Sequence, residues 1–152
     1  GLIKYEGEIL LDGKQLDTRK GFQIVFQNPF NSFDSKRKVG FSISEIIRLN
    51  SSNYILEELA EKVEINPEFM NKYPSELSLQ RLSIARALAG TPQVFILDEP
   101  TSALDVENQK KILDILKEIK DVTIIFISHD MNVLKYLSDE ILVLNPEKKK
   151  IK

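Results

Sequence analysis

The chain has 152 residues, of which 42% are hydrophobic and 29% are charged, and its formal net charge is −2. This size and composition are typical of one globular domain or of one core with a small insert, and the charge gives no reason to propose nucleic-acid binding. The absence of cysteine excludes disulfides and thiolate metal sites, and since no apolar stretch approaches the ~20 residues that span a bilayer, any membrane association has to go through a partner.

The first half of the chain predicts strands followed by helices. Residues 8–11 and 22–26 are predicted strands, and Asp12-Gly13 after the first is a tight-turn signal. Residues 28–35 have the composition of a loop. A helix is predicted to begin at Ser42 as its cap, a second covers residues 53–64 with a 3.6-residue apolar period, and Asn66-Pro67 begins a short helical turn.

The second half predicts a helix over residues 78–89, which ends at Gly90-Thr91-Pro92, and then an alternation of strands and helices. An α/β fold with a parallel sheet and covering helices follows from this alternation. The lysine-rich tail over residues 148–152 is expected to be frayed and solvated, with a membrane-surface role as the alternative. The predicted elements are strand 94–97, helix 106–119, strand 123–127, helix 131–137 and strand 141–144.

Two adjacent carboxylates, Asp98 and Glu99, follow the predicted strand at residues 94–97. Four consecutive apolar residues suit a strand buried on both faces of a parallel sheet, and open α/β sheets place ligand chemistry at the carboxyl ends of their strands. The first acid can hold Mg²⁺ and the second can orient a water, as NTP hydrolysis requires. An ordinary strand-to-loop junction is the alternative, but the Pro-Thr-Ser-Ala-Leu-Asp that follows makes chance a poor explanation.

The whole segment 94–105, Val-Phe-Ile-Leu-Asp-Glu-Pro-Thr-Ser-Ala-Leu-Asp, resembles the Walker B motif and D-loop of ABC-type ATPases, the nucleotide-binding subunits of ATP-driven transporters. Four other segments resemble landmarks of this family and come in the family's order. They are the small strand and turn after the P-loop helix (residues 6–14), the Q-loop (27–29, Gln-Asn-Pro), the signature helix with its approach (73–88) and the H-loop (124–130, Ile-Ile-Phe-Ile-Ser-His-Asp).

The resemblance implies an α/β fold with a RecA-like P-loop NTPase core over residues 1–30 and 90–152 and an inserted helical subdomain over residues 31–89. It implies ATP and Mg²⁺ as cofactors and a second ABC ATPase subunit, identical or different, as dimer partner. Transmembrane permease subunits are the other implied partners, which places the protein peripherally on the cytoplasmic face of the cell membrane. Residues 27–33 and 38–45 look most like the branch that imports oligopeptides, dipeptides or nickel.

By their places in these motifs, four residues are implied to carry the chemistry. Asp98 would hold Mg²⁺ through a water, and Glu99 would be the catalytic carboxylate that polarises the attacking water. Gln27 would touch both Mg²⁺ and that water, because a neutral amide both donates and accepts hydrogen bonds. His129 would hydrogen-bond the γ-phosphate. For Gln27 a common turn and for His129 a purely structural histidine are the alternatives.

Three further residues are implied to contact the partner subunit or its nucleotide. Ser102 and Asp105 match D-loop positions that reach across a dimer interface, and Ser78 matches the signature serine, which contacts the γ-phosphate of the opposite subunit's ATP. Asp105 is expected to cap the helix that begins at Val106 whatever else it does, and Ser78 has the same alternative as an N-cap.

The chain departs from the family pattern in having no G-x-x-x-x-G-K-[ST] segment, which the resemblance places just upstream of Gly1. Backbone N–H groups and the lysine of that loop supply most of the phosphate grip. Because the P-loop strand belongs beside the strand at residues 94–97, we expect that strand to lack a neighbour, the chain alone to fold poorly, and ATP hydrolysis to be slight or absent. Since it begins with Gly rather than Met, we expect the chain to be part of something longer.

The second departure lies in the signature, where Leu77-Ser78 runs directly into Leu79 instead of Gly-Gly-Gln. Those glycines let backbone N–H groups approach the partner's γ-phosphate, and leucine side chains are expected to obstruct it. Either residues are missing from this sequence here and around residues 50–54, or the deletion is real and the chain is a degenerate, regulatory ABC half that does not hydrolyse ATP. An ABC ATPase of repair or translation is a third reading, but those usually carry inserts that 152 residues cannot hold.

Overall fold

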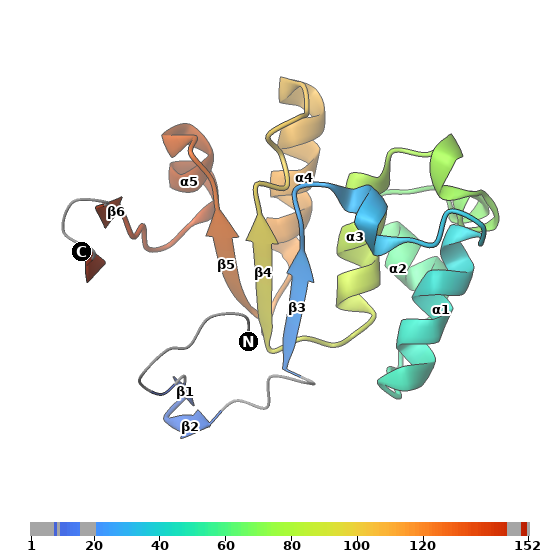
Figure 1. Ribbon diagram of the computed structural model, residues 1–152, viewed down its shortest axis with the longest axis horizontal. Helices are drawn as coiled ribbons and strands as arrows, with labels where there is room; N and C mark the ends of the chain where they lie inside the picture. Colours follow the sequence, from blue (N-terminus) through green and yellow to red (C-terminus); the bar gives the residue numbers. More distant parts are fainter. Residues whose placement is uncertain (1–7, 9, 16–20, 146–149, 152) are drawn as a thin grey trace.

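Three parallel strands form the centre of the protein (Figure 1). The structure is a computed structural model that describes residues 8, 10–15, 21–145 and 150–151. Strands β3 (Phe22–Val25), β4 (Val94–Asp98) and β5 (Thr123–Ile127) lie in the order β3-β4-β5. The predicted α/β fold with a parallel sheet is confirmed.

Strand β4 has a neighbour on each side, so the expectation that the strand at residues 94–97 lacks one was wrong. Its residues pair in register with β3, where Ile24 lies opposite Ile96, and with β5, where Ile96 lies opposite Ile125. Within the described residues, the unpaired edges of this sheet are instead the outer edges of β3 and β5. The apolar run in β4 therefore has all its ladder partners.

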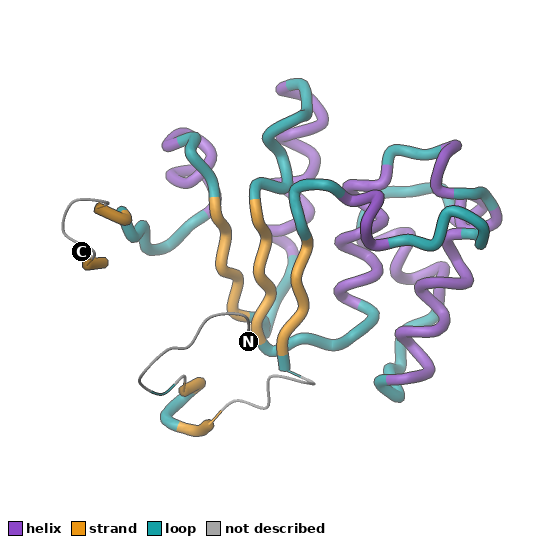
Figure 2. The backbone as a smooth tube through the Cα atoms, in the orientation of Figure 1, coloured by secondary structure: helices purple, strands orange, loops and turns teal. Residues whose placement is uncertain are grey.

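The segment between β3 and β4 is helical and lies to one side of the sheet (Figure 2). Helix α1 begins at Val39, before the predicted cap Ser42, which lies inside the helix and does not cap it. Burial explains the earlier start, because Val39 is fully buried and its N–H donates to the carbonyl of Lys72 at 2.9 Å. In chain order the elements are the 3₁₀ helix η1 (Pro29–Ser32), α1 (Val39–Leu49), α2 (Leu56–Lys62), the 3₁₀ helices η2 (Pro67–Asn71) and η3 (Pro74–Glu76), and α3 (Leu79–Leu88).

The helices after β4 begin at aspartates. Asp105 accepts a hydrogen bond from the N–H of Asn108 and caps α4 (Val106–Glu118), and Asp130 accepts one from the N–H of Asn132 and caps α5 (Met131–Leu137). The expectation that Asp105 caps this helix is confirmed. In the described ranges, no helix combines the length and the apolar character needed to cross a membrane.

Two small antiparallel ladders complete the described structure. Strands β1 (Leu10–Leu11) and β2 (Lys14–Gln15) flank the predicted turn, where Asp12 and Gly13 have φ values of 49° and 72° as a tight hairpin requires. Strand β6 (Leu144–Asn145) pairs with β7 (Lys150–Ile151), so the strand predicted over residues 141–144 is shifted toward the C-terminus. Residues 6, 7 and 9 of the family-like segment 6–14 and most of the tail 148–152 lie outside the described residues.

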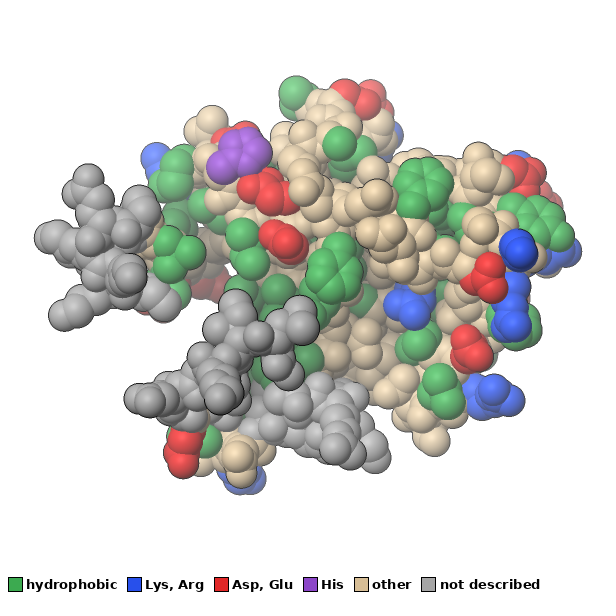
Figure 3. Space-filling view, in the orientation of Figure 1, with side chains coloured by type: hydrophobic (Ala, Val, Ile, Leu, Met, Phe, Trp, Pro, Cys, Tyr) green, Lys and Arg blue, Asp and Glu red, His purple; other side chains and the backbone are tan. Residues whose placement is uncertain are grey.

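The sheet has one covered face and one open face. Val25, Phe95 and Leu97 belong to the hydrophobic core that the buried sides of α3 and α4 also form. Side chains on the opposite face are largely exposed, and Figure 3 shows several apolar side chains beside two acidic ones at the centre of the view. The exposed apolar residues of β3, β5 and the residue after β3 are Ile24 (43%), Phe26 (53%), Ile125 (46%) and Ile127 (47%). A contiguous apolar face of this kind is typical of a surface that another element covers.

Gly40 provides a test of how the helical segment packs. A Cβ at this position of α1 would lie 2.8 Å from the carbonyl oxygen of Met70 in η2 and 3.1 Å from its Cβ. We predict that Gly40→Ala lowers the free energy of unfolding by about 1–3 kcal/mol, because the packing cost exceeds the gain of about 1 kcal/mol in helix propensity. Urea unfolding followed by circular dichroism measures this difference.

Ser44→Ala, on an exposed position of the same helix, is the matched control and should change the unfolding free energy by less than about 0.5 kcal/mol. A Gly40→Ala protein as stable as the parent would show that α1 and η2 do not pack as described.

Candidate functional site

The carboxyl ends of the three central strands bring four of the predicted site residues together. Gln27 follows β3, Glu99 follows β4, and His129 follows β5, while Ser102 lies in the loop that leads from β4 to α4. Parallel strands end at the same edge of a sheet, so residues distant in sequence become neighbours there. The hydrogen bonds of the structure join these four residues into one cluster.

Glu99 and His129 form the closest contact of this cluster. Oxygen Oε1 of Glu99 lies 2.8 Å from Nδ1 of His129 and also accepts a hydrogen bond of 3.1 Å from the backbone N–H of His129. The Glu99 side chain is 22% exposed and the His129 side chain is 80% exposed. The carboxylate is thus held on one side while the imidazole remains open to a ligand.

The backbone of Glu99 is held in an unusual conformation. Its φ is +49°, in the left-handed region that non-glycine residues rarely adopt. Its N–H donates to the carbonyl of Ile127 at 3.0 Å, which extends the pairing of β4 with β5 by one residue. Left-handed residues of this kind cluster at functional sites, because the surrounding structure has to enforce them.

Gln27 and Ser102 form the second half of the cluster. The amide nitrogen Nε2 of Gln27 donates to Oγ of Ser102 at 3.3 Å, and that hydroxyl donates to the carbonyl oxygen of Glu99 at 3.1 Å. The loops after β3 and β4 are therefore connected through one serine hydroxyl. Because the amide nitrogen is used in this contact, the amide oxygen of Gln27 is the atom left to act as a ligand.

Asp98 lies on the open face of the sheet. It pairs in register with Ile127, and the residue before it, Leu97, is fully buried on the covered face. Side chains alternate between the two faces along a strand, so Asp98 shares the open face with Ile96 and Ile127. Its carboxylate is half-buried at the carboxyl edge of the central strand.

The donors present suit Mg²⁺ bound together with a nucleotide. Among the described residues there is no group of three or more His, Cys, Asp or Glu side chains that could hold a metal. Mg²⁺ in phosphate sites is usually bound by only one or two protein oxygens, with water and substrate phosphates as the other ligands. The Asp98 carboxylate and the Gln27 amide oxygen are donors of this type.

The other two predicted residues lie outside the hydrogen-bonded cluster. Asp105 binds both the N–H (2.9 Å) and the side-chain amide (2.8 Å) of Asn108, and these hydrogen bonds, the backbone one first, lower the pKa of Asp105. Ser78 precedes α3, where its hydroxyl donates to Oε1 of Gln80 at 3.0 Å and makes no capping bond to the helix. Both side chains are exposed and accessible to a partner molecule.

The expectation that leucine obstructs the approach to Ser78 was wrong for Leu79. Its side chain is only 1% exposed and packs in the core, so it does not stand in front of the helix end. Leu77 is half-buried and packs against the same core. The first turn of α3 therefore presents Ser78 and Gln80 rather than an apolar barrier.

Sequence reasoning missed several groups that position the site. The carbonyl of Ile127 holds the Glu99 backbone, and no side-chain pattern could have revealed a role for a main-chain oxygen. Thr101 is 3% exposed and accepts a long hydrogen bond (3.4 Å) from the amide of Gln109 in α4. Asp130 caps α5, a role that its place directly before an apolar helical segment could have indicated.

The contact with Glu99 sets the protonation of His129. The hydrogen bond to Glu99 and the negative charge of that residue raise the pKa of His129 above its ordinary value of 6.5, while desolvation lowers it by a smaller amount and the charge of Asp130 raises it slightly. When Nδ1 of the imidazolium donates to Glu99, Nε2 carries a second N–H. The raised pKa therefore favours a form that can donate a hydrogen bond to an anion.

Two models of known protein families match this chain. The model of the family described as "ABC transporter" matches residues 1–102, and a model of an AAA domain matches residues 76–135. Among solved structures, the chain is similar to the ATP-binding cassette MJ0796, a dimer in a post-hydrolysis state bound to ADP and Pi. The TM-score is 0.68 and the sequence identity 27%, over 86% of this chain and 66% of that one.

Curated relatives include ATP-binding proteins of peptide transport. The oligopeptide transport ATP-binding protein OppF of Haemophilus influenzae is 37% identical over 95% of this chain and 50% of its own length. The oligopeptide transport ATP-binding protein AppF of Bacillus subtilis is 35% identical over 91% of this chain and 49% of its own length. The dipeptide transport ATP-binding protein DppF of Haemophilus influenzae is 36% identical over 95% of this chain and 49% of its own length. The chain thus spans about half the length of the curated relatives it matches. The alignment with OppF covers 167 residues, more than the 152 of this chain, so it includes positions that this chain lacks.

The Glu99–His129 contact can be tested by titration, because His129 is the single histidine of the chain. We predict that the pKa of His129 lies above 6.5 and that Glu99→Gln lowers it, since the amide carries no charge to stabilise the imidazolium. The chemical shifts of the imidazole followed by NMR across pH 5–9 report this value without ambiguity of assignment.

Glu107→Gln removes a carboxylate that pairs with Lys111 instead, and it should leave the pKa of His129 unchanged. An equal pKa in the parent and the Glu99→Gln protein would mean that the contact does not form in solution.

Proposed function

The chain belongs to the ABC transporter family of ATPases, and from this premise we propose that it acts within an ATP-hydrolysing subunit that energises the import of peptides. The cluster of Gln27, Glu99, Ser102 and His129 at the carboxyl edge of the sheet carries the proposal. It combines a carboxylate, an imidazole and an amide at the one edge where α/β sheets bind nucleotides. These are the groups that orient a water and stabilise a phosphoryl group in transfer.

Glu99 is proposed to orient the attacking water and to accept its proton. Both contacts from His129 go to Oε1 of Glu99, and the described residues give Oε2 no hydrogen-bond partner. A water bound at Oε2 can therefore be polarised while the other oxygen stays fixed. A general base held in one orientation contributes about 10²–10⁴-fold to a rate.

His129 is proposed to bind the γ-phosphate through Nε2. Its Nδ1 is engaged by Glu99, and the raised pKa favours the doubly protonated ring. A charged N–H that points toward a phosphate oxygen forms a stronger hydrogen bond than a neutral donor does. Glu99 would thus serve two purposes, as base for the water and as the group that keeps His129 protonated.

Asp98 and the amide oxygen of Gln27 are the groups proposed to hold Mg²⁺. The metal, when bound, would draw charge from the phosphate oxygens during transfer. The amide nitrogen of Gln27 also donates to Ser102, so Gln27 connects the proposed metal position with the D-loop-like segment. Because no G-x-x-x-x-G-K-[ST] segment occurs among these 152 residues, the main phosphate grip in this proposal comes from residues other than these.

A dimer and a membrane permease are the proposed partners. The similar MJ0796 structure is a dimer, which supports a partner subunit in contact with Ser78, Ser102 and Asp105. OppF, AppF and DppF are named for oligopeptide and dipeptide transport, which supports a peptide as cargo and a peripheral place at the cytoplasmic face of the membrane. Nickel, the other cargo that the resemblance allowed, has no support in these names. The division into a core (1–30 and 90–152) and a helical subdomain (31–89) remains part of the proposal.

A regulatory half that does not hydrolyse ATP is the second candidate. It is favoured by the direct step from Ser78 to Leu79, because Leu79 is a core residue and no glycine backbone is offered there. The wild-type protein would then bind nucleotide without turnover.

The intact mass of the natural protein separates the two candidates. The catalytic proposal predicts the additional mass of about three residues, Gly-Gly-Gln, between Ser78 and Leu79, located by peptide mapping. A peptide that runs directly from Ser78 to Leu79 would favour the regulatory candidate.

Substitution of Glu99 tests the catalytic proposal. We predict that Glu99→Gln in the complete protein retains ATP binding but loses ATP turnover by about 10²–10⁴-fold, because the amide cannot accept the proton of the water. Steady-state phosphate release and equilibrium binding of a fluorescent ATP analogue measure the two properties.

Glu68→Gln, at the exposed start of η2, is the control and should hydrolyse ATP as the parent does. Undiminished turnover in the Glu99→Gln protein would exclude the role assigned to Glu99.

A further inference from the structure

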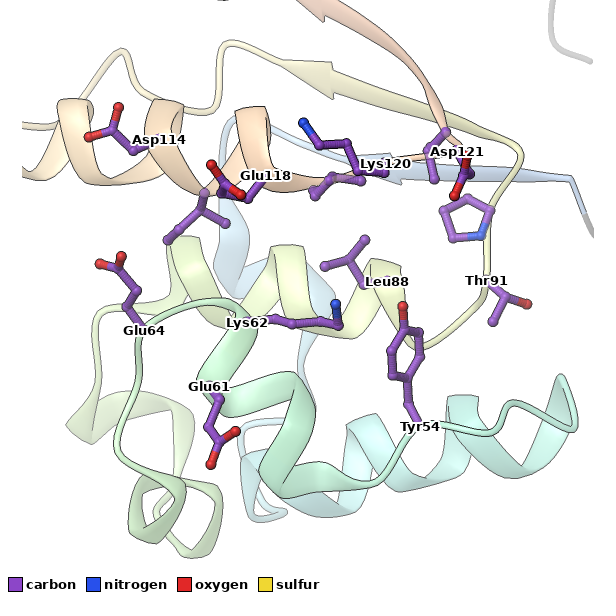
Figure 4. A pocket seen from close by; sticks show the side chains of 14 residues that line it. Tyr54, Glu61, Lys62, Glu64, Leu88, Thr91, Asp114, Glu118, Lys120 and Asp121 are labelled. Carbon is purple, nitrogen blue, oxygen red and sulfur yellow. The ribbon is translucent and has the colours of Figure 1, made fainter.

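A groove lies between the helical segment and the end of α4, away from the cluster described above (Figure 4). Its volume is about 810 Å³, within the range of roughly 300–1,000 Å³ in which proteins bind ligands. The groove lies where α4 ends and β5 begins, so it is near the amino ends of the strands. Its floor is apolar and is formed by Leu88, Pro92, Ile115, Ile119 and Val122.

The rim of the groove is strongly acidic. Five carboxylates and two ammonium groups line it, a net charge of −3, which is larger than the net charge of −2 of the whole chain. In the described part of the chain, none of the five carboxylates takes part in an ion pair. They are Glu61, Glu64, Asp114, Glu118 and Asp121.

The two lysines of the rim are engaged on their own sides of the groove. The ammonium group of Lys62 lies 5.7 Å from the centre of the Tyr54 ring, and that of Lys120 donates to the carbonyl of Lys117 at 3.0 Å. In Figure 4, Glu118 from α4 and Glu64 from the segment after α2 lie on opposite sides of the groove. The two ammonium groups therefore offset only part of the acidic charge of the groove.

Three helices end at this groove and add to its negative potential. Helix α2 ends at Lys62, α3 at Leu88 and α4 at Glu118, and each of these residues lines it. The last carbonyls of a helix carry about half a negative charge in total. The residues just beyond these ends, Glu64, Thr91 and Asp121, all have positive φ values between 48° and 60° and turn the chain away along the rim.

From these features we propose that the groove binds a basic segment of a partner protein, with an apolar side chain inserted on its floor and flanking lysine or arginine residues on its rim. An apolar anchor would contact Ile119 and Val122, the half-buried apolar residues of the floor, and the flanking cations would meet both the carboxylates and the helix ends. Charge complementarity of this kind fixes orientation and speeds association. A bare cation leaves the apolar floor unused, and an acidic segment would face an uncompensated like charge.

The binding of model peptides to the complete protein tests the proposal. The probe is a fluorescent twelve-residue peptide of alternating leucine and lysine, and its counterpart has glutamate in place of lysine. We expect the basic peptide to bind in a fluorescence anisotropy titration at low salt, the acidic one to show no binding, and the affinity to fall as salt is raised.

Variants locate the binding to the groove. Glu64→Gln combined with Glu118→Gln should weaken the basic peptide roughly tenfold, about threefold for each charge removed. Glu57→Gln combined with Glu140→Gln removes the same charge from exposed positions that do not line the groove, and it should leave the affinity unchanged. Lys120→Glu replaces an ammonium group of the rim by a carboxylate, a change of two charges, and should tighten binding roughly tenfold, a gain that a misfolded variant cannot produce.

Three results would overturn the proposal. The first is that the basic peptide does not bind the parent protein. The second is an equal loss of peptide affinity in the rim and control double variants. The third is that the tetra-amine spermine displaces the peptide and binds with the same affinity. The last result would assign the groove to a small polycation rather than to a protein segment.

Discussion

The parallel pairing of β4 with β5 is the interaction on which the rest of the site depends. It places Asp98 opposite Ile127 and is extended by the hydrogen bond from the Glu99 N–H to the Ile127 carbonyl. This extra bond holds Glu99 in its left-handed conformation and brings its carboxylate to His129. A register shifted by one residue would move Asp98 to the covered face and separate the carboxylate from the imidazole.

The two ends of the parallel strands carry different surfaces. At the carboxyl edge, loops carry Gln27, Glu99 and His129, and the helices that follow begin there with aspartate caps. At the opposite edge, α2, α3 and α4 end around the acidic groove. Helix α4, with 13 residues, extends from one region to the other and so separates them by about 20 Å. An occupied groove would therefore contact the same helix whose first turn follows Asp105.

The local sequence pattern predicted most of the helices, strands and turns, because these elements depend on residues that are close together in the chain. The alternation of apolar strands and periodic helices, the Asp12-Gly13 turn and the Asp105 cap all depend on chemistry within a few residues, and the structure has them. The start of α1 was missed because the burial of Val39 and its bond to Lys72 are tertiary contacts. The neighbours of β4 were wrongly predicted because strand order is set by distant pairing, which no local pattern contains.

The site was predicted in part for the same reason. Motif positions indicated Glu99, His129, Gln27 and Ser102, but not that one serine hydroxyl connects two loops or that both His129 contacts reach the same oxygen of Glu99. The burial of Leu79 was also beyond the local pattern, since it depends on how α3 packs in the core.

The central claim, that the carboxyl edge of the β3-β4-β5 sheet is the hydrolytic site, is tested most directly by a crystal structure of the complete protein with Mg²⁺ and a non-hydrolysable ATP analogue. We predict that the γ-phosphate lies within hydrogen-bond distance of Nε2 of His129, that the metal lies beside Asp98 and Gln27, and that a water contacts Oε2 of Glu99. A nucleotide bound elsewhere, with Glu99 and His129 remote from its phosphates, would contradict the account.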